Sequence, residues 1–392
     1  MLRVLFVTPS LAYGGAERHA VTLMCRLSEL GHECHAAYVK DLEPGQGAEV
    51  RARLADRVLC LHASRYFDRG AVAALAARLA QIQPDAVVAA NPYALMYASL
   101  AMRRARMRAP LVVTYHSTRI LGAKEQLKMI FYRPFFWSAD CAIFVSEKQK
   151  RHSLRRAVFA RHNEVIHNGV DTTRFSNHFS AVQRAAVRRA LGFSEQDYLI
   201  VIVALLRPEK NHVQLVDAVA ALRKRGIAAC VLMIGDGETR AAVEARVRAR
   251  GVERAVVITG FRREIRPYLA AGDVFALCSV TEAFSLAAIE AMALGKPVVH
   301  PDVGGAAEMI FPGRNGFLFP VGDTQALVDK LARLADRNTA EAMGQRAREI
   351  AQALFSEQMM VDRYEQTLLG LCRKQPAAGV SPALPTHPLS PH

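Results

Sequence analysis

Two glutamates, Glu282 and Glu290, lie eight positions apart in the segment of this chain that says most about chemistry. An apolar run typical of a strand ends near Leu277, and after a loop the pattern predicts a helix over residues 284–294, capped by Gly295. Glu290 then lies within a helix whose other residues are apolar, where a solvated carboxylate is out of place. We therefore expect both carboxylates to bind a ligand. A solvated helix face is the alternative.

The predicted start of this helix offers unpaired backbone N–H groups and the positive end of a helix dipole. Phe284, Ser285 and Leu286 can present these amides to a diphosphate, and small neighbouring residues let the phosphate approach. On such a ligand, Glu282 would hydrogen-bond the hydroxyls of a sugar, and Glu290 would accept from the hydroxyls of a ribose. The segment thus predicts a site for a nucleotide diphosphate that carries a sugar.

Two cations, Arg207 and Lys210, follow a predicted strand at residues 199–203. On a diphosphate, each charge-assisted contact is worth about 1.5–3 kcal/mol. Together they would take the place of a metal ion, so we expect neither a metal nor a cofactor. A surface loop of mixed charge is the alternative, and it is weaker for Lys210 than for Arg207.

Two loops of the first half could also reach a ligand. Gly14 and Gly15 join the first strand to the first helix, where paired glycines let the backbone come close to a substrate. This loop lacks the G-x-G-x-x-G spacing, which disfavours a nicotinamide or flavin oxidoreductase, and a tight turn without a ligand is the alternative. His116 follows an apolar strand at 112–114 and should point into a cleft, although a histidine in such a place is more often structural.

Six more short motifs occur in a fixed order along the chain. They are Gly14-Gly15-Ala16-Glu17-Arg18, His167-Asn168-Gly169-Val170-Asp171, Leu206-Arg207-Pro208-Glu209-Lys210-Asn211-His212, Gly235-Asp236-Gly237, Thr259-Gly260-Phe261 and Gly304-Gly305-Ala306-Ala307-Glu308. With the E-x7-E pair and the A-x-x-x-G-x-P-V-V that follows it, the chain resembles the retaining GT-B glycosyltransferases of group 1, often called family 4. The resemblance covers nearly the whole chain.

The resemblance implies roles for individual residues. The loop with Gly14 and Gly15 would approach the donor phosphates and the acceptor, His116 would touch the donor sugar, and Asn168 with Gly169 would serve as hinge and lining. The residues expected to bind the donor are Gly14, Gly15, Asn168, Gly235, Gly260, Phe261, Phe284, Ser285, Leu286 and Glu290, and of these Gly235, Gly260 and Phe261 would lie near the base. The expected catalytic residues are Lys210, Arg207, Glu282 and His116.

The resemblance also implies retention of the anomeric configuration by front-face substitution. The diphosphate would leave, stabilised by Lys210, Arg207 and the helix start, while its own oxygen helps to deprotonate the incoming hydroxyl. A nucleophilic Glu282 is less favoured. One common form of the family's pattern has an arginine where this chain has Leu205, so Arg207 must supply that charge if any arginine does.

The elements that would position these residues follow one rhythm twice. The predicted strands lie at 4–7, 34–39, 86–88, 199–203, 231–234, 256–258, 274–277 and 297–299, and the helices between them include 16–30, 71–82 and 213–225. Alternating strands and helices are typical of a parallel, doubly wound sheet. We therefore expect an α/β protein of the GT-B class, with two Rossmann-like domains that face each other across a deep cleft.

The domain limits follow from composition and turn residues. We expect an N-terminal, acceptor-binding domain over 1–172, a linker over 173–190 and a C-terminal, nucleotide-sugar-binding domain over 191–355. A helix over 356–372 could pack back on the N-terminal domain. The last segment, 373–392, is rich in Pro, Ala and Ser and should be disordered.

The composition is that of an ordinary α/β protein, with 51% apolar and 22% charged residues in 392. The chain shows neither a run of about 20 apolar residues that could cross a bilayer nor a signal-peptide cleavage region, so we expect a cytoplasmic protein. The seven cysteines are scattered without a C-x-x-C spacing, which argues against disulfides and zinc.

The net charge of +15 is concentrated in the first half, where residues 1–189 hold 28 Lys and Arg against 14 Asp and Glu. Such asymmetry suggests an anionic partner, with solvated arginine-rich helix faces as the alternative. Residues 103–108 are arginine-rich, and residues 124–137 mix cations with aromatics. The second stretch suits a membrane surface, where each Lys or Arg contributes about 1 kcal/mol, unless its aromatics pack inward.

We therefore expect peripheral binding to the inner face of the cytoplasmic membrane. The acceptor would be a glycan or a lipid-linked sugar in the synthesis of cell-surface polysaccharide or lipopolysaccharide. Nucleic-acid binding is disfavoured because no recognised motif accompanies the basic half. A sugar-nucleotide epimerase or hydrolase with the same fold remains an alternative, whereas a phosphorylase would need a cofactor lysine motif that is absent.

Overall fold

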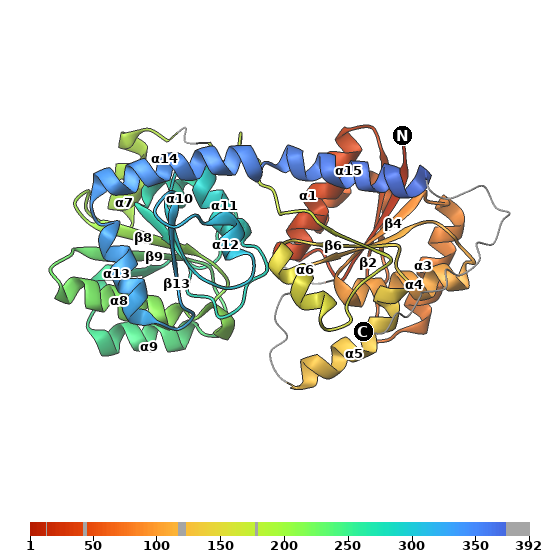
Figure 1. The fold of residues 1–392 in the computed structure, drawn as a ribbon, viewed down its shortest axis with the longest axis horizontal. Coiled ribbons are helices and arrows are strands. Elements are labelled where there is room, and N and C mark those ends of the chain that lie inside the picture. The colour runs from red at the N-terminus through yellow and green to blue at the C-terminus, as the bar shows by residue number, and fades with distance from the viewer. Residues whose placement is uncertain (13, 42–44, 117–122, 177–178, 374–392) are drawn as a thin grey trace, which may run out of the picture.

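The chain forms two α/β domains in the computed structural model, which describes residues 1–12, 14–41, 45–116, 123–176 and 179–373, the side chains of 123–126 excepted. Figure 1 shows them side by side, with the N-terminal domain in red to yellow and the C-terminal domain in green to blue, except that the last helix, in blue, lies on the N-terminal domain. Each domain has its own parallel sheet with helices on both faces, as expected from the alternation of strands and helices.

The N-terminal domain is built on a seven-stranded sheet in the order β3-β2-β1-β4-β5-β6-β7. Its strands are β1 Arg3–Thr8, β2 Glu33–Tyr38, β3 Val58–Cys60, β4 Ala86–Ala90, β5 Leu111–Tyr115, β6 Cys141–Phe144 and β7 His162–Val165. Its helices are α1 Gly15–Glu29, α2 Gly47–Leu54, α3 Arg69–Ile82, α4 Asn91–Arg104, α5 Ala123–Trp137 and α6 Glu147–Leu154, with a short 3-10 turn η1 Ala55–Arg57. The central strands are wholly buried because helices cover both faces of the sheet.

The C-terminal domain repeats this plan with a six-stranded sheet in the order β10-β9-β8-β11-β12-β13. Its strands are β8 Tyr198–Val203, β9 Ala229–Ile234, β10 Val256–Ile258, β11 Val274–Ala276, β12 Val298–Pro301 and β13 Gly316–Phe319. Its helices are α7 Ala181–Ala190, α8 His212–Lys224, α9 Arg240–Arg250, α10 Arg266–Ala271, α11 Leu286–Ala293, α12 Ala306–Met309, α13 Thr324–Arg333 and α14 Arg337–Leu354, with 3-10 turns η2 Pro208–Lys210 and η3 Glu253–Ala255. The last helix of the chain, α15 Glu357–Arg373, follows α14.

Both sheets reverse their strand order at one point, between β1 and β4 and between β8 and β11. Parallel strands on either side of such a point send their loops to opposite faces, which leaves a crevice at the carboxyl ends of the strands. The loops that follow β1, β8 and β11 carry Gly14, Lys210 and Glu282. The expected two-domain GT-B architecture is therefore confirmed.

Two backbone segments cross between the domains and lie against each other. Val170 bonds to the backbone on both sides of Ser356, because its N–H donates to the carbonyl of Phe355 and its carbonyl accepts from the N–H of Glu357. Gly169 allows this approach, since a Cβ there would lie 2.5 Å from the Ser356 carbonyl oxygen. Helix α14 thus ends on the C-terminal domain, and α15 begins on the N-terminal one (Figure 1).

Helix α15 belongs to the core of the N-terminal domain. Its residues Met360, Val361, Tyr364 and Leu368 are buried with the apolar face of α1 and the first strands. The chain that leaves the C-terminal domain at α14 is therefore also held to the N-terminal domain by the buried apolar face of α15. The predicted tail over 373–392 lies outside the described residues except for Arg373, which ends α15.

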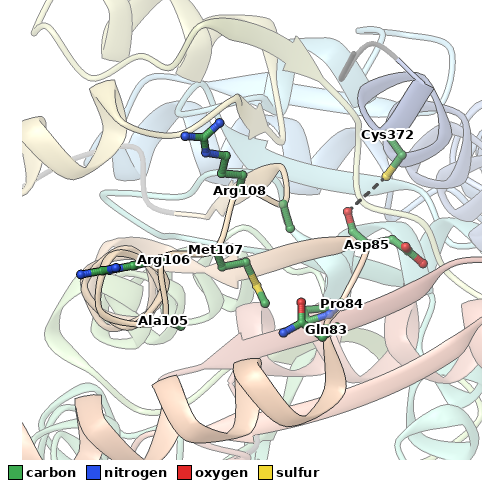
Figure 2. A pocket seen from close by; sticks show the side chains of 9 residues that line it. Gln83, Pro84, Asp85, Ala105, Arg106, Met107, Arg108 and Cys372 are labelled. Atoms are coloured by element: carbon green, nitrogen blue, oxygen red, sulfur yellow. Dashed lines mark hydrogen bonds between the residues drawn. The ribbon is translucent and has the colours of Figure 1, made fainter. Parts of the chain in front are cut away.

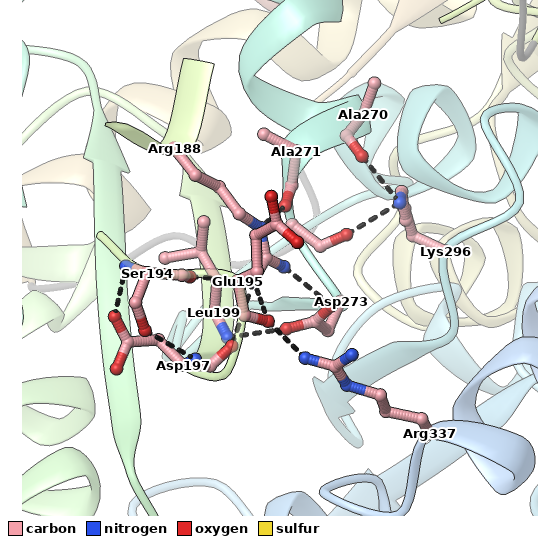
Figure 3. A network of polar contacts seen from close by, with 11 residues as sticks. Arg188, Ser194, Glu195, Asp197, Leu199, Ala270, Ala271, Asp273, Lys296 and Arg337 are labelled. Carbon is pink, nitrogen blue, oxygen red and sulfur yellow. Dashed lines mark hydrogen bonds and ion pairs between the residues drawn. The ribbon is translucent and has the colours of Figure 1, made fainter. Parts of the chain in front are cut away.

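The crossing between the domains is shorter than the linker that we placed at 173–190, because α7 packs on the C-terminal domain. Figure 3 shows why: Arg188 of α7 is buried and its guanidinium binds the carbonyl oxygen of Ala271 at 2.8 Å and the carboxylate of Asp273 at 2.7 Å. Nearby, the ammonium of Lys296 donates to the carbonyl oxygens of Ala270 and Gly272. Burial lowers the pKa of Lys296 to about 8.

The second sheet also continues beyond residues 297–299, where the predicted rhythm ended. Strand β13 pairs with β12 over four residues, and Pro312 and Pro320 flank it closely. Such a short strand between prolines has little periodicity to detect. Within the described parts of the chain, none of the helices combines the length and hydropathy that a membrane span requires.

Candidate functional site

Lys210 and Glu282 meet at the point where the C-terminal sheet reverses its order. Lys210 ends the turn η2 after β8, and its ammonium forms an ion pair with the Oε1 atom of Glu282 in the loop after β11. The hydroxyl of Ser279 donates to the same oxygen at 3.0 Å. Burial alone would raise the pKa of Glu282, but the attraction and hydrogen bond of Lys210, together with His300 and the Ser279 hydroxyl, lower it overall. Glu282 is therefore held as a carboxylate.

Glu290 lies in α11, the helix that follows the Glu282 loop, and its side chain faces the N-terminal domain. It is only 1% exposed, and its Oε1 atom forms an ion pair with Arg18 of α1, whereas its Oε2 atom has no hydrogen-bond partner in the described structure. The first turn of α1 and the middle of α11 therefore face each other across the domain boundary. A buried carboxylate oxygen without a partner is costly, and it marks a place where a ligand hydroxyl can donate.

The helix that carries Glu290 starts two residues later than predicted, at Leu286. Ser285 has an extended conformation and acts as the N-cap, because its hydroxyl accepts from the N–H of Ala288 at 3.2 Å. The N–H groups of Leu286 and Ala287 donate no hydrogen bond within the described chain, so they are the amides that face outward.

Phe284 therefore precedes the helix, and its ring contributes to packing between the domains. The ring stacks on the imidazole of His167 with centroids 4.8 Å apart and meets Phe355 edge-on. Its carbonyl oxygen accepts from the side-chain amide of Asn168 at 2.9 Å. Asn168 thus ties the crossing between the domains to the loop before α11.

Two glycines fix the loop that carries Glu282. Gly304 has a φ of +57°, and a Cβ there would lie 2.0 Å from the carbonyl oxygen of Glu282. The N–H of Gly305 donates to the carbonyl of Ala283 at 2.8 Å. The turn after β12 can press against this loop only because it has no side chains at these positions.

Arg207 lines a second part of the same region, a cavity of about 540 Å³. The other residues that line this cavity are Leu205, Glu209, Asp236, Gly237 and Glu238. Gly235 and Gly260 form a bridge that brings the loops after β9 and β10 together. Phe261, the next residue, is 46% exposed. The expected residues Arg207, Gly235, Gly260 and Phe261 thus belong to loops at the carboxyl ends of the strands, on the side where Lys210 lies.

In the N-terminal domain, Gly14 and Gly15 begin α1, and Glu17 folds back over them. A Cβ at Gly14 would lie 2.1 Å from a carboxylate oxygen of Glu17. Burial raises the pKa of Glu17, although attraction to Arg207 of the other domain acts in the opposite sense. The first turn of α1 therefore brings one charge toward Arg207 and another toward Glu290.

His116 lies at the end of a row of polar groups, of which His19 and Tyr364 are buried. The backbone N–H of His116 donates to the side-chain oxygen of Asn91 at 3.1 Å, and its imidazole lies 4.5 Å from that of His19. The Nε2 atom of His19 lies 3.0 Å from the hydroxyl of Tyr364 on α15. Burial lowers the pKa of His19 to about 4 and that of His116 far below its usual range, so both rings are neutral at pH 7.

The domains also touch at α12, beside the loop that carries Glu282. The carboxylate of Glu308 on α12 accepts from the N–H groups of Glu147 and Lys148, each at 2.9 Å, and from His167 at 3.0 Å. Burial would raise the pKa of Glu308, but these hydrogen bonds lower it. A carboxylate at the start of α6 complements the helix dipole, so this contact stabilises the arrangement of the domains seen here.

A separate hollow of about 440 Å³ lies at the end of the N-terminal sheet where the strands begin. Figure 2 shows it between the turns that precede β4 and β5, where the Sγ atom of Cys372 points to the carbonyl of Asp85 and Arg106 and Arg108 extend from the rim. These turns lie at the amino ends of the strands. The hollow is therefore separate from the loops at the carboxyl ends of the strands, where Lys210 and Glu282 meet.

Glu17 and Arg18 entered the sequence-based prediction only as members of the motif over residues 14–18, without a role of their own, and His19 and His300 were not singled out. Glu17, Arg18 and His19 come just after the paired glycines. The run of charged and polar residues at the start of that helix was the signal in the sequence that could have identified them. His300 is the third residue of β12, is completely buried, and donates from its Nδ1 atom to the carbonyl oxygen of Pro301 at 2.7 Å. Because a carbonyl only accepts, its Nδ1 atom carries the proton there.

Comparison with known proteins gives two family matches that together span both domains. Residues 183–350 match the model described as "Glycosyl transferases group 1", and residues 13–174 match the model described as "Glycosyltransferase Family 4". The two matches meet at the crossing between the domains.

Individual relatives agree with these matches. The D-inositol 3-phosphate glycosyltransferase of Jonesia denitrificans is 30% identical over 286 residues, which cover 67% of this chain and 67% of the relative. The GDP-mannose-dependent alpha-mannosyltransferase of Mycobacterium tuberculosis is 27% identical over 349 residues, or 85% and 87% of the two chains. The solved structure of Anabaena HepE in complex with UDP-glucose has a TM-score of 0.82 at 23% identity, over 94% of this chain and all of HepE, and shows the same fold.

Proposed function

Because this chain belongs to the group 1 glycosyltransferases, which here have the GT-B fold, we propose that it moves a sugar from a nucleotide-diphosphate sugar to a hydroxyl group with retention of the anomeric configuration. The observation that carries the proposal is the ion pair of Lys210 with Glu282, near a helix start with free amides and a buried Glu290 that has one unpartnered oxygen. Cations and amides suit a diphosphate, and carboxylates suit hydroxyls.

In the proposed reaction the bond between the anomeric carbon and the diphosphate breaks, and the diphosphate leaves with both electrons. Lys210, Arg207 and the amides of Leu286 and Ala287 stabilise the charge that develops on it, without a metal or cofactor. The acceptor oxygen attacks from the same face, and a diphosphate oxygen takes its proton. The sugar hydroxyls are held by Glu282 and His116, and the ribose hydroxyls by Glu290.

The donor must be found by experiment, because similar proteins differ in this respect. The mannosyltransferase of Mycobacterium tuberculosis depends on GDP-mannose, whereas HepE was solved with UDP-glucose. Isotope-labelled sugar nucleotides with several bases and sugars should be incubated with the protein, and the products analysed by NMR. Transfer or slow hydrolysis that yields the α anomer from an α-linked donor supports the proposal. Epimerised nucleotide sugar, or an inverted product, would overturn it.

We further propose a glycan or lipid-linked acceptor at the inner face of the cytoplasmic membrane, in the synthesis of cell-surface polysaccharide or lipopolysaccharide. Helix α5 supports this. Its Met129, Tyr132 and Phe136 are buried, but Leu127, Ile130, Phe131 and Trp137 are 47–68% exposed. Trp137 packs against the exposed Phe159 and donates to the carbonyl of Ala157, close to the exposed Arg155 and Arg156. Exposed apolar residues beside cations suit an anionic bilayer surface.

Flotation with vesicles of anionic and of neutral lipid tests this surface. The wild-type protein should float with anionic vesicles at moderate salt, and the double variant Ile130→Ser, Phe131→Ser should remain in the dense fraction. Val182→Ser is a matched control because Val182 is 74% exposed on the C-terminal domain. Equal flotation of the wild type and the double variant would contradict the assignment of α5.

A further inference from the structure

Arg18 and Glu290 form an ion pair that joins the two domains. Arg18 lies in the first turn of α1 in the N-terminal domain, and its guanidinium pairs with a carboxylate that is 99% buried in the C-terminal domain, because Glu290 is 1% exposed. Attraction to the Glu290 carboxylate favours the charged form of the Arg18 guanidinium and raises the pKa of Arg18. Glu290 thus has a fixed positive charge beside it in this closed arrangement.

Neither partner is fully used by this contact. A guanidinium has five N–H donors, and Arg18 makes one hydrogen bond, through Nη2, to the described residues. The Oε2 atom of Glu290 is buried and accepts no hydrogen bond there. Donors and an acceptor therefore remain available at one point, and a ligand that offers both phosphate oxygens and hydroxyls would satisfy both.

The charges of the C-terminal domain show why a further cation is needed. Lys210 is already paired with Glu282. Arg207 is the cation that lines a cavity with three carboxylates, those of Glu209, Asp236 and Glu238. Of the three, only Asp236 has an ion-pair partner among the described residues, Arg240. Leu205 contributes no charge to it. A diphosphate bound against this domain alone would meet more negative than positive groups, which is unfavourable in a partly buried site.

We propose that Arg18 is a donor-binding residue that the N-terminal domain contributes: its free N–H groups bind the diphosphate while its contact with Glu290 orients the second carboxylate oxygen toward the ribose. The donor would then be held by both domains, so its binding would be coupled to their closure. This inference rests on the proposed function, since it takes a nucleoside diphosphate as the ligand.

The test compares a nucleoside diphosphate with its nucleoside. UDP, GDP and ADP are titrated calorimetrically into the wild-type protein, and the tightest is chosen together with the matching uridine, guanosine or adenosine. In Arg18→Gln the diphosphate should bind at least tenfold more weakly, and the nucleoside should change by less than threefold. Arg18→Lys keeps the charge and should lose an intermediate factor. Arg53→Gln, which removes an exposed arginine of α2 paired with Glu29, should change neither affinity.

The outcomes separate this inference from the function on which it depends. If the wild type binds a diphosphate and Arg18→Gln binds it equally well, the role of Arg18 is refuted and the proposed function stands. An equal loss of diphosphate and nucleoside affinity would show that Arg18 acts only through Glu290, which also contradicts the proposal. If the wild type binds none of the diphosphates, both fail. Circular dichroism of each variant shows whether it is folded, and Arg18→Lys decides the matter if Arg18→Gln is not.

Discussion

Lys210 is the residue on which the proposed chemistry depends most. Removal of one preorganised group that stabilises developing charge costs roughly 10²–10³ in kcat. We expect Lys210→Ala to lower kcat about 100-fold with a smaller change in KM, because the charge on the leaving diphosphate is greatest in the transition state. Steady-state kinetics with the donor found by product analysis provides the measurement.

The matched control is Lys224→Ala, at the exposed end of α8. It removes the same side chain from the same domain and should leave kcat unchanged. A Lys210→Ala variant that retains more than a third of the wild-type kcat would show that the leaving group is stabilised elsewhere.

The buried histidines make a second prediction, on stability against pH. The pKa of His19 is about 4 in the fold, against 6.5 for an ordinary histidine, so the unfolded chain binds the proton more tightly. The free energy of unfolding should therefore fall as the pH drops below 6.5, and the loss from His19 should level off near pH 4. The difference of about 2.5 pH units corresponds to about 3 kcal/mol at most.

Urea unfolding at pH 7.5, 6.5, 5.5 and 4.5 measures this slope. His19→Gln should flatten it, whatever the variant does to stability at pH 7.5, and His162→Gln at the exposed end of β7 should leave it as it is. An unchanged slope in His19→Gln would mean that His19 is not the group that resists protonation.

At the scale of elements, the loop after β11 depends on how closely the turn after β12 approaches it. Gly304→Ala should move the Glu282 loop, because the added Cβ would lie 2.0 Å from a carbonyl oxygen. We expect a loss of about 1–3 kcal/mol in unfolding free energy and at least a tenfold loss in kcat/KM. Both are measured on one purified variant.

Gly313→Ala separates the close approach from backbone strain. Gly313 also has a positive φ, +80°, but no atom lies within 4 Å of the position of its Cβ. It should therefore lose up to about 1 kcal/mol of stability and retain its activity. Similar activity losses in the two variants would contradict the proposed support of the Glu282 loop.

The elements themselves were largely predictable, and the exceptions have physical causes. Long strands such as β8 and long amphipathic helices repeat a period often enough to be recognised. The start of α11 was predicted two residues too early because several neighbouring residues could have capped the helix. Ser285 is the cap, since Phe284 packs on His167 outside the helix. Helix α7 was assigned to the linker because its attachment depends on one buried residue, Arg188, in a basic stretch.

At the scale of the whole molecule, contacts between the domains were beyond sequence reasoning. Lys210 and Glu282 could be expected to meet because they follow adjacent strands of one sheet. Arg18 with Glu290 and Glu308 with the start of α6 join residues of different domains, and no periodicity relates them. These contacts depend on how α15 and the backbone pairing of Val170 with the segment around Ser356 set the domains against each other.

The central claim is that a nucleotide diphosphate binds in the cleft between the domains, and hydrogen exchange with mass spectrometry tests it directly. With the tightest-binding nucleoside diphosphate present, peptides over residues 205–210 and 282–290 should become protected, and a peptide over 14–18 should follow them. Protection confined to other surfaces, such as the hollow at Gln83 and Arg106 in Figure 2, would contradict the claim.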